Sequence, residues 1–256
     1  MSLVALLFIS LATSLGAMFL LWCLSLALRD ASIVDIWWGP GFALISLVSF
    51  ALAPEGNALA TGITVLWGLR LGAYLLARNA GHGEDPRYQA MRRHHGARFP
   101  LVSLATVFAL QGVLMWFVSL PVQVANHGGA GPAPVTAALG FGLWALGLFF
   151  ETVGDLQLSR FRAEPASQGQ VMDRGLWRYT RHPNYFGDAC AWWGIWLVCL
   201  GAPGAAWTVL SPAVMTFFLL RISGVALLER SIGKRRPEYV EYQRRTSAFI
   251  PLPPKQ

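Results

Sequence analysis

Long apolar runs separated by short polar segments make up most of this chain of 256 residues. Each run approaches the length of about 20 residues that an α-helix needs to cross the hydrocarbon core of a membrane. The apolar residues do not alternate with polar ones, as they would in half-buried strands. The pattern predicts an all-α integral membrane protein with seven transmembrane helices. These predicted spans cover residues 3–28, 33–52, 58–77, 101–122, 135–158, 185–200 and 205–228.

The composition favours a membrane protein over a soluble enzyme. Hydrophobic residues make up 55% of the chain and charged residues 13%, which is about half of the charged share of soluble domains. Since the spans occupy nearly all of the sequence, we expect a single transmembrane domain over residues 1–256. The net charge of +7 fits contact with anionic membrane lipid. It does not require nucleic acid, and no obligate protein partner is indicated.

The positive residues predict the orientation in the membrane. Arg70 and Arg221 lie within predicted spans, and the other Lys and Arg residues fall at Arg29 and in the segments 78–98, 160–181 and 230–255. The alternate connections, 53–57, 123–134 and 201–204, contain none. Because cytoplasmic loops are rich in Lys and Arg, we expect the N-terminus outside and the C-terminus in the cytoplasm. We expect 123–134 to be a Gly/Pro-rich outer loop, and the tail 229–256 to form a short amphipathic helix at the interface.

The sequence motifs do not indicate metal or disulfide chemistry. Cys190 and Cys199 lie in one predicted span and face opposite sides of a helix, and Cys23 lies in another, so no disulfide or metal pair is expected. No P-loop, nucleophile elbow, zinc motif or Rossmann fingerprint is present. If a dinucleotide binds, it must bind between membrane helices.

Residues 174–188 gather polar side chains into one turn beside the membrane. Such groups are costly there unless something binds to them, and arginines suit phosphate recognition. Pro183 is a first-turn proline for a helix, whose free amides offer a further anion contact. We therefore expect a phosphate-bearing cofactor on the cytoplasmic face. The candidate residues of this turn are Arg174, Arg178, Arg181, His182, Asn184, Tyr185 and Asp188.

Two further groups of polar residues occur in the N-terminal spans. Asp35 begins the second span, where desolvation could keep its carboxyl group protonated as a hydrogen-bond donor in a substrate pocket; the alternative is an interfacial acid paired with Arg29. Trp67, Tyr74 and Arg78 follow one stripe of the third span toward the cytoplasm.

The later spans carry their own polar residues. Asp155 lies near the end of the fifth span, and Arg162 follows it. Trp192 shares a face of the sixth span with Asn184 and Asp188. Arg221 and Ser223 lie on the seventh span, and Glu229 follows it. A structural network of ion pairs is an alternative for Asp155. The functional interpretation is that Asp155 orients cofactor hydroxyls while Arg162 meets phosphate.

Several motifs resemble the C-terminal region of the steroid 5α-reductase superfamily, and within it the branch of uncharacterised bacterial membrane proteins. They are Gly175-Leu-Trp-Arg-Tyr-x-Arg-His-Pro-Asn-Tyr-x-Gly-Asp188, Ser223-Gly-x-x-Leu-Leu-Glu229, Arg236-Pro-Glu-Tyr-x-x-Tyr242, Ser247-Ala-Phe-Ile-Pro251 and Glu84-Asp-Pro-Arg-Tyr88.

The resemblance implies seven helices that hold NADPH in a cytoplasm-facing cavity. The substrate-side helices would be about 1–122 and the cofactor-side helices and loops about 135–256. Asp155, Arg162, Asn184, Asp188, Trp192, Arg221 and Tyr74 fall where the family places cofactor contacts. Asp35 falls near its substrate-binding Glu, and Trp67 replaces its substrate-binding Tyr.

The resulting hypothesis is an NADPH-dependent reductase in a bacterial inner membrane. It would act on a hydrophobic enone or alkene, steroid-like or isoprenoid, with Asp35 and the Trp67 indole polarising the substrate carbonyl. The turn is also similar to that of S-adenosylmethionine-dependent methyltransferases of the isoprenylcysteine carboxyl type. Those enzymes have two adjacent Glu residues on the last helix, where this chain has Leu228-Glu229, with one acid. A third alternative is a lipid-binding protein whose arginines contact headgroups.

Overall fold

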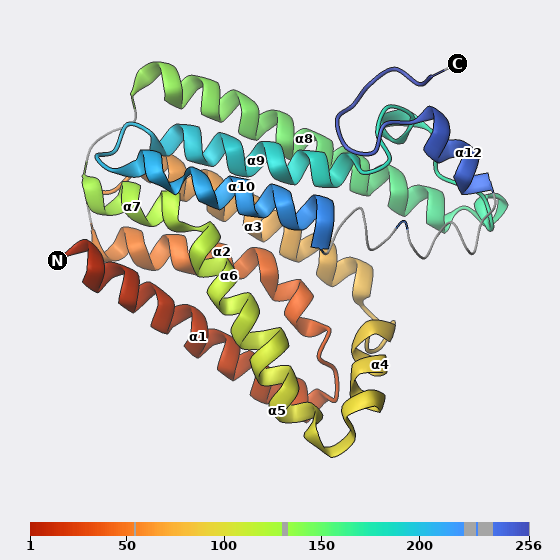
Figure 1. Ribbon diagram of the computed structural model, residues 1–256, viewed down its shortest axis with the longest axis horizontal. Helices are drawn as coiled ribbons and strands as arrows, with labels where there is room; N and C mark the ends of the chain where they lie inside the picture. Colours follow the sequence, from red (N-terminus) through yellow and green to blue (C-terminus); the bar gives the residue numbers. More distant parts are fainter. Residues whose placement is uncertain (54, 130–132, 223–228, 230–237, 256) are drawn as a thin grey trace. The chain divides into compact units, whose positions relative to one another are not determined.

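The computed structural model describes residues 1–53, 55–129, 133–222, 229 and 238–255, and every regular element in these residues is helical (Figure 1). The all-α class is therefore confirmed. Six helical segments of the described chain are long and apolar enough to cross a membrane: Leu3–Leu28, Ile33–Leu52, Ala58–Asn79, Pro86–Val118, Pro134–Ala163 and Ala205–Ile222. The predicted span 185–200 is the shorter helix α9, Pro183–Cys199, of 17 residues.

The chain divides into two compact units, which are described separately. The N-terminal unit comprises residues 1–136 and 198–208. Its principal helices are α1 (Leu3–Leu28), α2 (Ile33–Leu52), α3 (Ala58–Asn79), α4 (Pro86–His95), α5 (Phe99–Ser103), α6 (Leu110–Val118) and α7 (Leu120–Gly128). A 3₁₀ turn at Gly96–Arg98 precedes α5, and a π-helical turn at Leu104–Ala109 joins α5 to α6.

Helices α2 and α3 are in direct backbone contact at glycines. A methyl group at Gly68 would lie 2.3 Å from the carbonyl oxygen of Gly39, and one at Gly72 would lie 2.6 Å from Cγ of Pro40. Small residues four positions apart allow such close approach of membrane helices. The sequence pattern Gly68-xxx-Gly72 thus corresponds to a real packing contact.

The expectation of an outer loop over 123–134 is wrong for its first half, because α7 extends to Gly128. The helix is stabilised by a buried polar network centred on Asn126. Its side-chain oxygen accepts from the backbone N–H of Asn57 at 3.0 Å and from the hydroxyl of Thr61 at 3.2 Å, while its Nδ2 donates to the Ser49 hydroxyl at 2.8 Å. These bonds compensate the desolvation of a buried amide, which a Gly/Pro count cannot reveal.

The C-terminal unit comprises residues 137–197 and 209–256. Its described elements are α8 (Pro134–Ala163), the 3₁₀ turns η3 (Pro165–Ser167) and η4 (Gly175–Arg178), α9, α10 (Leu210–Phe217), the π-turn η6 (Phe218–Ile222) and α12 (Glu238–Arg245). The 3₁₀ turn η5 (Ala205–Val209) precedes α10.

Helices α8 and α9 lie side by side (Figure 1) and touch at glycines spaced seven residues apart. A methyl group at Gly147 would lie 2.5 Å from the Gly187 carbonyl oxygen, and one at Gly194 would lie 2.6 Å from the Gly140 carbonyl oxygen. Because these contacts are with backbone atoms, no side-chain movement could relieve a clash. The glycines therefore allow the close packing of α8 and α9, which sets the position of the turn that precedes α9.

The tail prediction is confirmed in part. Residues 238–245 form the helix α12, with Tyr239 and Tyr242 buried on one face. Residues 223–228 and 230–237, including the predicted site residue Ser223, lie outside the described part of the chain.

Candidate functional site

Residues 173–182, called the turn below, contain the 3₁₀ turn η4 and lead into α9. Gly175 has a φ of +57°, in the left-handed region that glycine adopts without steric cost. A methyl group there would also lie 2.4 Å from Nε2 of Gln157. Gln157 needs this space because its Oε1 accepts from the backbone N–H of Leu176 at 3.0 Å. The glycine thus lets the turn approach α8 closely.

Trp177 anchors the turn to the glycine-lined face of α8. Its indole N–H donates to the backbone carbonyl of Gly154 at 3.1 Å, and its own carbonyl accepts from the hydroxyl of Tyr242. Pro183, which begins α9, packs over the same Gly154. The turn is therefore held between α8 and α12, two elements far apart in the sequence.

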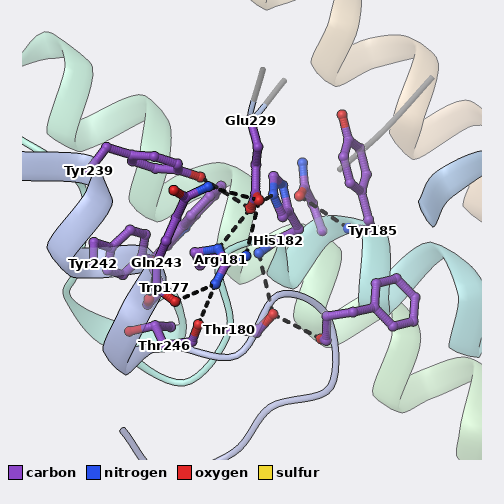
Figure 2. A network of polar contacts seen from close by, with 12 residues as sticks. Trp177, Thr180, Arg181, His182, Tyr185, Glu229, Tyr239, Tyr242, Gln243 and Thr246 are labelled. Atoms are coloured by element: carbon purple, nitrogen blue, oxygen red, sulfur yellow. Dashed lines mark hydrogen bonds and ion pairs between the residues drawn. The ribbon is translucent and has the colours of Figure 1, made fainter. Parts of the chain in front are cut away.

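Arg181 is the centre of a polar network that joins the turn to the C-terminal segment (Figure 2). Its Nε and Nη2 donate to the two carboxylate oxygens of Glu229 at 2.7 and 3.0 Å. Its Nη1 donates to the backbone carbonyls of Gln243 and Thr246. With a side chain only 10% exposed, Arg181 directs these donors to protein acceptors. The expected phosphate contact of Arg181 is thus replaced by a structural role.

Glu229 collects several donors besides Arg181. Nε2 of His182 lies 3.1 Å from Oε1, and Nε2 of Gln243 donates to Oε2 at 3.0 Å. Burial by itself would raise the pKa of Glu229, but the hydrogen bonds and charges of His182 and Arg181 outweigh it and lower the pKa to about 2. Burial and the Glu229 charge raise the pKa of Tyr239. Glu229 is therefore ionised, and its carboxylate joins the turn to α12.

The imidazole ring of His182 stacks on Tyr185 of α9. The two ring centroids are 5.3 Å apart and the planes differ by 7°. His182 therefore bridges Glu229 and the first turn of α9, so both predicted site residues contribute to the same network.

The residues after α12 run back along the turn. The backbone N–H of Arg181 donates to the Ser247 carbonyl at 2.9 Å, and the Thr180 hydroxyl donates to the Phe249 carbonyl at 2.8 Å. The N–H of Leu252 donates to the Tyr179 carbonyl at 2.9 Å. These bonds resemble a short strand pairing without forming a regular strand.

A cavity of about 680 Å³ opens between the turn and this tail. Arg174 and Arg178, two of the predicted phosphate ligands, line it, and both are exposed. The lining residues are Asp173, Arg174, Gly175, Arg178, Arg245, Thr246, Pro254 and Lys255. The donor set is mainly cationic and suits an anion with several oxygen acceptors.

Asp155 and Asn184 meet where α8 faces the start of α9. Nδ2 of Asn184 donates to Oδ1 of Asp155 at 3.4 Å, and Asp155 is 4% exposed. Trp192 is fully buried and lies two helical turns after Asn184 on the same face of α9. Asp188 is on the same face. Asp155 of α8 thus contacts Asn184 of α9.

Asp35, in the N-terminal unit, does not act as the protonated donor that we expected. Its Oδ2 accepts from Nη2 of Arg87 at 2.6 Å, and its Oδ1 accepts from the Tyr88 hydroxyl at 2.7 Å. Since an arginine can only donate, the carboxyl group of Asp35 acts as an acceptor in this arrangement. Its cationic partner is Arg87 and not Arg29. The pair ties α4 to the start of α2.

Trp67 is also placed differently from the expectation. Its side chain is 0% exposed and packs edge-on against Phe42, with 5.6 Å between ring centroids. It is therefore a core residue of the α2–α3 contact and not the wall of an open pocket. Further along α3, the guanidinium of Arg78 lies over the Tyr74 ring at 5.8 Å.

The remaining predicted residues lie in the C-terminal unit. Arg162 is exposed near the end of α8, and Arg221 is exposed in η6. Within the described residues, no group of three or more His, Cys, Asp or Glu side chains could hold a metal ion.

Sequence reasoning missed several residues of these sites. Gln243, Arg245 and Lys255 contact the turn or line the cavity, although nothing in the local sequence distinguishes them from an ordinary basic tail. Tyr239 and Tyr242 carry a weak signal, since their spacing of three places both on one face of a helix. Tyr88 belongs to the motif Glu84–Tyr88, but its contact with Asp35 follows only from the return of α4 to α2.

Three comparisons with known proteins bear on the identity of the chain. A family model with the description "Protein of unknown function (DUF1295)" matches residues 21–246. No curated protein matches significantly, and no solved structure does.

Proposed function

The chain belongs to the DUF1295 family, and we propose that it is a membrane-embedded, NADPH-dependent reductase of a hydrophobic enone or related alkene. The family is associated with steroid 5α-reductase-like proteins, in agreement with the motifs of the turn and tail. The alternative that shares the turn is an S-adenosylmethionine-dependent methyltransferase.

The observation that carries the proposal is the arginine-lined cavity beside the turn. Its volume of about 680 Å³ lies within the range of small-molecule and cofactor sites. Arg174 and Arg178 line it, and their planar guanidinium groups match phosphate oxygens. S-adenosylmethionine offers such a lining one carboxylate beside its sulfonium and ammonium cations, whereas NADPH offers several phosphate groups, which favours NADPH.

The pair of Asp155 and Asn184 supports a second contact with the cofactor. An asparagine side chain offers both a donor and an acceptor, which suits a carboxamide. The hydrogen bond from Asn184 to Asp155 orients that amide. We propose that Asn184 holds the nicotinamide carboxamide and that Asp155 positions Asn184.

We also propose the membrane arrangement that this function needs. With α9 as a seventh span, the Lys and Arg distribution places the N-terminus outside, the C-terminus inside and the turn at the cytoplasmic face of a bacterial inner membrane. Nucleotide cofactors are available on that side. The substrate would enter from the lipid.

Bound NADPH would supply a hydride to the β-carbon of the conjugated alkene. The chain would have to polarise the substrate carbonyl with hydrogen-bond donors. Preorganised donors of this kind stabilise charge that develops on a carbonyl oxygen.

The test is to identify by mass spectrometry the nucleotide that co-purifies with the detergent-extracted protein. We expect NADPH or NADP⁺ in the wild type and its loss in Asn184→Ala. Glu241→Gln, an exposed change on α12, serves as the matched control and should retain the nucleotide. Recovery of S-adenosylmethionine, or of no nucleotide, would contradict the proposal.

A further inference from the structure

We infer that the C-terminal segment 245–255 supplies half of a phosphate-binding site, with Arg245 and Lys255 lining the same cavity as the arginines of the turn. This inference rests on the proposed function, since it assigns residues to the phosphate end of the same cofactor. It makes Arg245 and Lys255, the two ends of the segment 245–255, part of the binding site.

The tail is held in the right place by its backbone. The N–H of Lys255 donates to the carbonyl of Arg245 at 2.8 Å, so that the segment between them closes on itself. The N–H of Leu252 is bonded to the turn at Tyr179. Both cations of the tail therefore line the same cavity as Arg174 and Arg178.

The charges of the cavity point to an anion. Four cationic side chains line it, Arg174, Arg178, Arg245 and Lys255, against one carboxylate, Asp173. Nη2 of Arg245 donates to Oδ2 of Asp173 at 2.7 Å. This leaves an excess of positive charge in a concave site, where mutual repulsion is relieved by a bound polyanion. A nucleotide bearing several phosphate groups has that chemistry.

The ion pair of Asp173 and Arg245 is a competitor for the ligand. Both side chains are partly exposed, at 39% and 46%, so the pair itself contributes little stability. Phosphate oxygens could replace Asp173 as the acceptor of Arg245. Asp173 thus weakens anion binding, and its removal should strengthen it.

The experiment measures NADPH affinity by calorimetry on the full chain in phosphatidylcholine nanodiscs. We expect Arg245→Gln and Lys255→Gln each to raise the Kd about tenfold, the value of one charge-assisted contact. Asp173→Asn should lower the Kd, a gain that misfolding cannot produce. Inorganic pyrophosphate should compete with NADPH for the wild type and less well for the two tail variants.

Arg244→Gln is the matched control. Arg244 precedes Arg245 on α12 and is 75% exposed, but it pairs with Glu241 at 3.6 Å and does not line the cavity. Its Kd should stay within about twofold of the wild type. If NADPH binds the wild type and both tail variants match this control, the inference fails while the reductase proposal stands.

A second arm distinguishes a nucleotide from a lipid headgroup, which carries the same phosphate oxygens. Native mass spectrometry would count phosphatidylglycerol retained by the wild type and by Lys255→Gln. If the wild type binds no NADPH but loses phosphatidylglycerol in this variant, the site holds a lipid, and both proposals are overturned.

Discussion

Glu229 is the acceptor on which the turn and the tail converge, and its charge controls their stability. Because the pKa of Glu229 is lowered from its ordinary value of 4.5 to about 2, the folded state binds its proton less readily than the unfolded chain. Its stabilising effect is complete above pH 4.5 and is lost as the pH falls toward 2. We expect Glu229→Gln to reduce the free energy of unfolding at neutral pH by about 2 kcal/mol, after allowing for partial exposure.

The measurement is thermal unfolding in detergent between pH 7 and pH 3. The wild type should lose stability over the acidic range, and Glu229→Gln should lose less, since it lacks the titrating carboxylate. Glu241→Gln removes an exposed acid of α12 and should change the free energy by less than about 0.5 kcal/mol. Identical acid dependence in the wild type and Glu229→Gln would contradict the role given to Glu229.

The α8–α9 contact sets the position of the turn at the scale of elements. A methyl group at Gly147 would lie 2.5 Å from the Gly187 carbonyl oxygen and 2.6 Å from the backbone nitrogen of Ala191. We expect Gly147→Ala to force the helices apart and to lower the free energy of unfolding by about 1–3 kcal/mol. It should also weaken NADPH binding, because Asp155 and Asn184 lie on these two helices.

Gly142→Ala on the same helix is the control, since a methyl group there meets nothing within 4 Å. It should be neutral, or stabilising by up to about 1 kcal/mol through better helix propensity. Thermal unfolding and NADPH titration of both variants check the prediction. Equal behaviour of the two alanines would show that the helices do not need the glycine contact.

The helices were predictable from the sequence where their lengths are set by the membrane. Leu3–Leu28 and Ile33–Leu52 match the predicted runs to the residue, because hydrophobic length is a local property. The partners within the sites were not predictable in the same way. The sequence predicts Arg181 as a phosphate ligand, because only the fold brings Glu229 and the carbonyl of Thr246 to its guanidinium group. The sequence likewise predicts Asp35 as a donor, because it does not show that the return of α4 brings Arg87 to this carboxyl group.

The topology of the whole molecule depends on whether α9 crosses the membrane. At 17 residues it extends about 26 Å, slightly less than a hydrocarbon core of about 30 Å. Local thinning of the bilayer accommodates such a difference at a modest cost. The connection 201–204 lacks Lys and Arg, which favours an outer position. We therefore expect α9 to span.

Cysteines introduced one at a time test this arrangement in a background with Cys23→Ala, in which the two remaining cysteines, Cys190 and Cys199, are buried. Pro203→Cys, at an exposed position after α9, should react with a membrane-impermeant maleimide in intact cells. Arg244→Cys, at a 75% exposed position of α12, should react only after the membrane is permeabilised. Opposite accessibility of the two sites requires an odd number of crossings between residues 203 and 244, as expected if the segment Ala205–Ile222 crosses once. If both cysteines react in intact cells, the tail and its cavity lie outside, away from cytoplasmic NADPH, and the proposed cofactor would be wrong.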